Sequence, residues 1–234
     1  VGTSVIVQEL FYNTPARLKF LKTPATENGY IHDIIGKLAL SHPEIAFKLI
    51  NKGRLVLATP GNDDLLECMA SLYGNKIINE VCEINFSGEN VSISGFGAKP
   101  TLIKSSRQWQ TFIVNARVVN SRIIAKALDN AYHSLLPKTG YPLAVLKIAL
   151  PADAIDVNVH PQKSEIKFKE ESNLFRAVYN AVSTALAAPK ATEAAMPAPV
   201  VSGIRPAAAP SVYQEKPYTA SHTLNLWREE PVPL

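Results

Sequence analysis

The run from Leu143 to Leu150 is the sequence feature that most narrows the possible folds. Every position in it is apolar except Lys147. A strand that is covered on only one face alternates apolar and polar residues, whereas a strand inside a sheet that is covered on both faces is apolar throughout. We therefore predict a central strand over residues 143–150 that is buried on both sides.

Shorter patterns predict the elements around this strand. Alternating β-branched and polar residues separated by turn signals indicate three hairpins, over 45–51 with 54–59, 81–86 with 91–96, and 110–114 with 117–119. Apolar residues at helical spacing behind capping residues indicate four helices, over 26–40, from the cap at Asp63 or Asp64 to the stop at Gly74, from the cap at Ser121, and over 172–187. These elements predict an α+β fold with a mixed or antiparallel sheet and helices on one face.

The first predicted helix has a clear apolar stripe. Its apolar residues recur every three to four positions and are expected to lie on one face of the helix, namely Tyr30, Ile31, Ile34, Ile35, Leu38 and Ala39. His42 and Pro43 end the helix, because the residue before a proline disfavours helical geometry.

The composition is that of a globular protein up to about residue 188 and changes to a proline- and alanine-rich segment after it. Of the 234 residues, 47% are hydrophobic, and the two cysteines, Cys68 and Cys82, form no metal-ligand or disulfide pattern. A reducing cytoplasmic compartment fits this usage, and no apolar run approaches the length of a membrane span. The chain opens on Val1 within a strand-like segment, which suggests a fragment. Residues 189–234 are rich in proline and alanine and are expected to form a disordered linker.

The stretch from Asp156 to Phe168 is the most informative local motif. Ile155, Val157 and Val159 alternate with polar residues, and the pattern resumes after Pro161, so we expect a tight hairpin that carries Lys163 at its tip. In an arbitrary protein such a lysine is most often a solvated turn residue.

Charge is concentrated in one window of the chain. Between Lys99 and Lys147 there are eight basic residues and a single acid, Asp129, with Trp109 and Phe112 interspersed. This pattern is typical of a surface that contacts a phosphate backbone without reading its sequence, and we weigh it equally against a solvated basic face. The candidate DNA-binding residues are Arg107, Arg117, Arg122 and Lys126.

Other catalytic signatures do not stand out. The sequence contains no phosphate-binding G-x-x-x-x-G-K-[ST] loop, no legible nucleophile–base set and no metal-ligand cluster. From these residues alone the chain is not predicted to be a self-sufficient enzyme.

Three motifs carry a family resemblance. Residues 2–21, which include Phe11-Tyr12-Asn13-Thr14-Pro15-Ala16-Arg17, the run from Phe112 to Arg117, and the run from Asp156 to Lys163 resemble motifs of the MutL DNA mismatch repair proteins. The resemblance covers residues 1–188. It implies that residues 1–22 end a GHKL-type ATPase domain, that residues 23–188 form a transducer domain with the fold of the second domain of ribosomal protein S5, and that residues 189–234 are the interdomain linker.

The same resemblance implies roles for individual residues. Lys163 would act in catalysis by contacting the γ-phosphate of ATP, Thr3 would line the nucleotide pocket, and Arg122 would lie in the DNA groove. The intact protein would use ATP and Mg²⁺, whereas this chain, which lacks the nucleotide-binding core, should bind no cofactor and be inactive by itself. Ala116 departs from the family pattern because glycine is usual there, and a positive φ would strain alanine.

The resemblance also implies partners and leaves alternatives open. The partners would be DNA, the ATPase domain, the mismatch-recognition protein MutS and a second copy in a homodimer, in a bacterial cytoplasm. The alternatives are a nucleic-acid-binding module without a nucleotide contact and the transducer domain of a type II topoisomerase. The Asn158-Val159-His160-Pro161 run argues against the topoisomerase.

Overall fold

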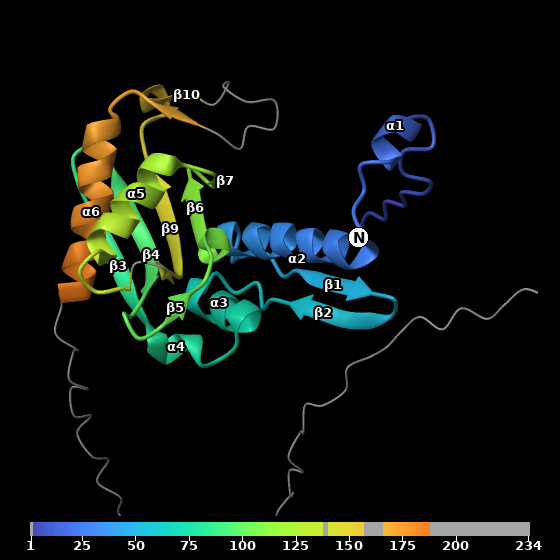
Figure 1. Cartoon of the computed structure of the whole chain (residues 1–234), viewed down its shortest axis with the longest axis horizontal. Coiled ribbons are helices and arrows are strands. Elements are labelled where there is room, and N and C mark those ends of the chain that lie inside the picture. The colour runs from blue at the N-terminus through green and yellow to red at the C-terminus, as the bar shows by residue number, and fades with distance from the viewer. Residues whose placement is uncertain (1, 138–139, 157–165, 188–234) are drawn as a thin grey trace, which may run out of the picture. The chain divides into compact units, whose positions relative to one another are not determined.

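The computed structural model describes residues 2–137, 140–156 and 166–187 (Figure 1). The chain divides into a unit of residues 1–190 and a unit of residues 191–234, and the second lies outside the described residues. None of the described helices combines the length and the apolar character needed to cross a bilayer. Because residues 189–234 lie outside the described residues, the linker expected there stays a prediction.

A five-stranded mixed sheet organises the first unit. Its strands follow the order β3–β4–β9–β6–β7, with bounds Val81–Ser87, Ser92–Ala98, Ala144–Ala149, Gln110–Val114 and Arg117–Val119. The apolar run predicted as the central strand forms β9, which pairs antiparallel with β4 and parallel with β6. This confirms that the 143–150 run lies at the centre of the sheet.

The described residues also form three two-stranded pairs. They are β1 (Lys48–Asn51) with β2 (Arg54–Ala58), β5 (Ile103–Lys104) with β8 (Tyr141–Pro142), and β10 (Ile155–Asp156) with β11 (Lys167–Phe168). The helical elements are α1 (Pro15–Leu18), α2 (Pro24–Ser41), α3 (Leu65–Tyr73), α4 (Ile77–Glu80), α5 (Arg122–Tyr132) and α6 (Glu171–Ala187), with 3-10 turns η1 (Arg107–Trp109) and η2 (Ala152–Ala154).

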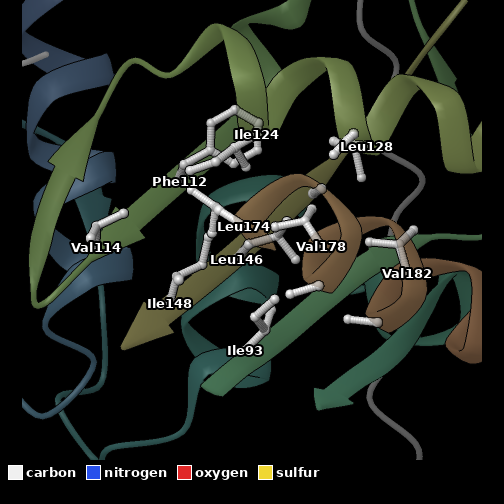
Figure 2. Close-up of a cluster of buried hydrophobic side chains, with 14 of the residues drawn as sticks. Ile93, Phe112, Val114, Ile124, Leu128, Leu146, Ile148, Leu174, Val178 and Val182 are labelled. Carbon is white, nitrogen blue, oxygen red and sulfur yellow. The ribbon is translucent and has the colours of Figure 1, made fainter. Parts of the chain in front are cut away.

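Helices α5 and α6 cover one face of the sheet (Figure 1). Apolar side chains from alternate positions of the strands meet those of the two helices in one buried cluster (Figure 2). Its members include Ile93, Phe112, Val114, Leu146 and Ile148 from strands, Ile124 and Leu128 from α5, and Leu174, Val178 and Val182 from α6. This layer agrees with the predicted α+β class.

The expected placement of helices on one face was incomplete. The opposite side chains of the same strands, such as Ile113 and Val145, pack in a second cluster with Leu40 of α2 and Met69 of α3. A central strand that is apolar at both alternating sets of positions needs a cover on both faces, and the second cover comes from these helices.

The caps predicted from the sequence hold the helix ends. The side chain of Asp64 accepts from the backbone N–H of Glu67 at 3.0 Å, and that of Ser121 accepts from the N–H of Ile124 at 3.3 Å. Each bond satisfies a backbone donor that has no partner within its helix. The cap at Ser121 fixes where α5 begins and thus where Arg122 lies.

Most of the apolar stripe of α2 does not face the core. Tyr30, Ile31, Ile34 and Leu38 are 53%, 46%, 58% and 40% exposed, whereas Ala39 and Leu40 are fully buried. The stripe predicted from the spacing is thus largely exposed over the greater part of the helix. Only the C-terminal end of α2 packs in the second cluster, through Ala39 and Leu40.

Candidate functional site

A groove of about 440 Å³ brings together three of the four candidate DNA-binding residues. Arg122 and Lys126 come from the first turns of α5, and Arg107 comes from η1, which precedes β6. Residues four apart lie on the same side of a helix, so Arg122 and Lys126 form a row along the groove. Phe112 and Gln110 of β6 also line it.

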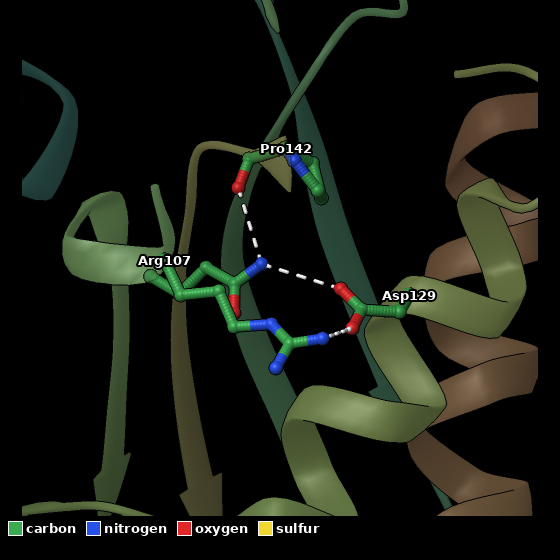
Figure 3. Close-up of polar contacts among 4 residues, drawn as sticks. Arg107, Asp129 and Pro142 are labelled. Atoms are coloured by element: carbon green, nitrogen blue, oxygen red, sulfur yellow. Dashed lines mark hydrogen bonds and ion pairs between the residues drawn. The ribbon is translucent and has the colours of Figure 1, made fainter. Parts of the chain in front are cut away.

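Arg107 is held from two directions. Its Nη2 donates to Asp129 Oδ2 at 2.5 Å (Figure 3), and its guanidinium carbon lies 4.8 Å from the centroid of the Tyr141 ring. A planar guanidinium suits both an ion pair and stacking on an aromatic face. The side chain nevertheless remains 57% exposed, which leaves it open to the groove.

A buried amide orients the carboxylate of Asp129. Gln110 is 8% exposed, and its Nε2 lies 3.5 Å from Asp129 Oδ1 and 3.5 Å from the carbonyl oxygen of Pro142 (Figure 3). The two carboxylate oxygens of Asp129 thus face different donors. Asp129 itself is 26% exposed at its side chain.

Among the described residues, the other two cations of the groove lack the kind of acidic partner that Arg107 has. Across residues 2–137, 140–156 and 166–187, neither Arg122 nor Lys126 forms an ion pair. Both side chains are exposed. An exposed, unpaired cation is available to an external anion without first losing an internal partner.

Arg117 does not join this group. It begins β7, directly after the turn at Asn115 and Ala116, and it is exposed but does not line the groove. The four predicted DNA-binding residues therefore separate into a group of three and one residue at the end of a hairpin.

Other basic residues of the same window have local partners. Lys104 Nζ lies 4.2 Å from the centroid of the Trp109 ring, and Lys99 Nζ donates to the carbonyl oxygen of Asn79 at 2.5 Å. Lys147 lines a separate hollow among serine and asparagine side chains. The charge count along the chain thus overestimated the number of cations that share one surface.

The structure says less about the two predicted nucleotide-site residues than about the predicted DNA-binding residues. Lys163 lies outside the described residues, and Thr3 is exposed in a segment without regular secondary structure. The strands at the ends of the Lys163 loop do pair as expected, with Ile155 opposite Phe168 and Asp156 opposite Lys167. The pairing at the base of the predicted hairpin is confirmed. The rest of the hairpin, over residues 157–165 with Lys163, lies outside the described residues and stays a prediction.

The sequence reading missed a clamp at Asn115. Its side-chain Nδ2 donates to the carbonyl oxygen of Leu150 at 2.9 Å, and its Oδ1 accepts from the backbone N–H of Leu150 at 3.0 Å. Leu150 follows β9 and leads through η2 to β10. Asn115 therefore ties the β6–β7 turn to the segment that enters the Lys163 hairpin. No local pattern indicates this pair, because the two residues are 35 positions apart.

Comparisons with known proteins give a consistent result. A family model described as DNA mismatch repair protein, C-terminal domain, matches residues 69–187. The DNA mismatch repair protein MutL of Halalkalibacterium halodurans is 42% identical over 186 residues, which cover 79% of this chain and 29% of that protein. This chain thus spans less than a third of that relative.

Two solved structures share the fold. A crystal structure of the N-terminal domain of a DNA repair protein has a TM-score of 0.63 at 22% identity, and the match covers 75% of this chain and 58% of that one. A point mutant of the Aquifex aeolicus MutL ATPase domain has a TM-score of 0.52 at 20% identity, over 75% of this chain and 59% of that one.

Proposed function

The chain belongs to the MutL family of DNA mismatch repair proteins, and from that premise we propose that it is the transducer part of such a protein. In this role it contacts DNA through the groove beside α5 and couples ATP binding in a neighbouring ATPase domain to DNA contact, dimerisation and signalling to repair partners such as MutS. The observation that carries the DNA contact is that Arg122 and Lys126, which form no ion pair with any residue that the structure describes, share one groove with Arg107.

The groove suits the phosphate backbone better than the bases. Two of its cations, Arg122 and Lys126, lie in a row on α5, and such cations attract phosphates whatever the base sequence. Two polar side chains, Asn120 and Ser121, lie beside them in the same groove. Binding of this kind releases counterions and is weakened steeply by salt.

A separate surface supports the coupling role. The exposed residues of α2 form an apolar stripe, and apolar side chains of the β1–β2 hairpin are exposed as well, among them Ile50, Leu55 and Val56. Exposed apolar area of this kind usually has a protein partner. Since the chain spans 29% of its relative's length, we assign this surface to the ATPase domain of the intact protein.

The DNA contact is tested by reversing the charge of the two free cations. Chain 1–234 with Arg122→Glu and Lys126→Glu should bind duplex DNA at least tenfold more weakly at 50 mM salt, and the slope of log K against log salt should fall by about 1.8, or about 0.9 for each lost contact. Fluorescence anisotropy over 50–200 mM salt measures both quantities.

The matched control reverses two exposed cations elsewhere. Lys48→Glu with Arg54→Glu changes the net charge by the same amount on the β1–β2 hairpin. If this control weakens binding as much as the groove variant does, net charge alone governs binding and the groove has no specific role.

The ATP-coupling role is tested in the intact protein. Lys163→Ala should reduce ATP turnover strongly if the lysine contacts the γ-phosphate, because a charge-assisted contact to the terminal phosphate is lost. Wild-type turnover in that variant would refute the role of Lys163 and leave the DNA contact unaffected.

A further inference from the structure

The groove contains one acidic side chain among three cations. We propose that Asp129 limits the DNA affinity of the groove by neutralising Arg107, so that two phosphate contacts are available instead of three. The inference rests on the proposed DNA contact and adds to it a residue that sets its strength.

Two contacts act on Arg107 in different ways, since one positions its guanidinium and the other neutralises its charge. The Tyr141 ring, 4.8 Å from the guanidinium carbon, supports the group from one side without cancelling its charge. The Asp129 carboxylate, 2.5 Å from Nη2, cancels it. Removal of the carboxylate charge would therefore leave a cation that Tyr141 still holds at the groove.

The carboxylate also acts on the ligand directly. A phosphate that approaches Arg107 comes close to Asp129, and like charges repel each other at short range. Asp129 lines the groove, with Arg107 Nη2 at 2.5 Å from one carboxylate oxygen and Nε2 of the buried Gln110 at 3.5 Å from the other. The acid thus lowers the attraction of the groove twice, by pairing with Arg107 and by repelling the ligand.

The competing explanation is that Asp129 only joins η1 to α5. In that case its loss would loosen the groove, and DNA binding would stay unchanged or weaken. Asp129→Asn separates the two explanations, because asparagine keeps a side chain of similar size with one oxygen acceptor for Arg107 but removes the negative charge. Its amide nitrogen replaces the second acceptor, which faces Gln110 Nε2 at 3.5 Å.

We expect Asp129→Asn to bind a 20-base-pair duplex about fivefold more tightly at 50 mM salt, with a salt slope steeper by about 0.9 because one more phosphate contact forms. Arg107→Ala alone should weaken binding, because it leaves the Asp129 carboxylate in the groove without its partner. In the Arg107→Ala/Asp129→Asn double variant, most of the gain should disappear. Anisotropy titrations of chain 1–234 at several salt concentrations give all of these values.

The matched control is Asp33→Asn. Asp33 is also an ion-paired acid, 2.7 Å from Lys37 Nζ on α2, and its side chain is 46% exposed. It does not line the groove. The same gain in this control would show that overall charge is responsible and would overturn the inference.

The remaining outcomes are also decisive. If Asp129→Asn binds no tighter while Arg122→Glu with Lys126→Glu weakens binding, the inference fails and the proposed DNA contact stands. If the charge-reversed pair has no effect, both fail. Should Asp129→Asn not fold, the Arg107→Ala/Asp129→Ala variant still provides the test, because it removes a neutral pair and should bind within about twofold of the wild type. A loss as large as that of Arg122→Ala would show that Arg107 already binds DNA in the presence of Asp129.

Discussion

The turn between β6 and β7 contains two residues with positive φ. Asn115 has φ of 46° and Ala116 has φ of 64°, as two-residue hairpin turns of the favoured type require. Asparagine tolerates this region, whereas alanine loses about 1 kcal/mol there because its Cβ approaches the following carbonyl oxygen. Ala116 was expected to be strained if its φ were positive, and its φ of 64° meets that condition.

Replacement of Ala116 by glycine should therefore stabilise the protein. We expect the free energy of unfolding to rise by about 0.5–1 kcal/mol, since glycine adopts this conformation without the steric cost. Urea unfolding at pH 7 measures the change. Ala25→Gly at an exposed position of α2 is the control and should destabilise; a loss of stability in both variants would show that the turn is not strained.

Gly95 in β4 gives the opposite prediction. Its φ is 136°, and a Cβ built on it would lie 2.0 Å from the carbonyl oxygen of Val145 in β9. Gly95→Ala should thus cost at least about 3 kcal/mol, because neighbouring strands must separate to admit a methyl group. Gly29→Ala, at a helix position with no atom within 4 Å of the added carbon, should instead stabilise by up to about 1 kcal/mol. Equal urea midpoints for the two variants would refute the close approach of β4 and β9.

At the scale of elements, Asn115 links the β6–β7 hairpin to the exit of β9. Asn115→Gly keeps the positive φ but removes both side-chain bonds to Leu150. We expect a loss of about 1–2 kcal/mol in the free energy of unfolding, from two hydrogen bonds at a solvent-exposed site. Hydrogen exchange should also speed up at Leu150. Unchanged exchange there would show that the clamp does not restrain this segment.

Local sequence patterns predicted where helices and strands lie better than they predicted which faces are buried. The hairpins, the caps at Asp64 and Ser121 and the central strand follow from short-range periodicity, and the structure confirms them. The stripe on α2 has the same periodicity as a core-facing helix, yet it is exposed, because periodicity shows that a face is apolar and not what covers it. The second helical layer was missed for a similar reason, since its contacts join residues far apart in the sequence.

The candidate site shows the same limit. The charge count identified Arg107, Arg122 and Lys126, which do share a groove, but it also included Lys104, which lies over Trp109. Asp129 was visible only as the single acid of the window. Its pairing with Arg107 depends on how η1 packs beside α5, which no local pattern specifies.

At the scale of the whole molecule, buried acidic groups predict sensitivity to alkali. Burial raises the pKa of the Cys68 thiol from 9.0 to about 11 and that of the Tyr73 phenol from 10.0 to about 12. Burial also raises the pKa of Tyr132, whose hydroxyl donates to the carbonyl oxygen of Ala98 at 2.5 Å. The folded state thus holds these groups in their neutral forms.

The sign of the effect follows from proton linkage. Below pH 9 both states keep their protons, so these groups contribute their full stabilisation. As the pH rises from 9 to 11 the unfolded chain releases the Cys68 proton first, and from 10 to 12 it releases the Tyr73 proton first. Each release favours unfolding by at most about 1.4 kcal/mol per pH unit. The free energy of unfolding should therefore be steady from pH 7 to 9 and fall above that.

Two variants test whether Cys68 and Tyr73 cause the decrease in the free energy of unfolding above pH 9. Tyr73→Phe keeps the ring that lies 5.3 Å from Trp109 and removes only the ionisable group, so the part of the fall between pH 10 and 12 should become shallower. Cys68→Ala should remove the part that begins near pH 9, at the cost of a small cavity at pH 7. Urea midpoints at pH 7, 9, 10 and 11 separate the two effects. If both variants keep the slope of the wild type, ionisation at these two sites does not control alkaline unfolding, and other groups of the chain must do so.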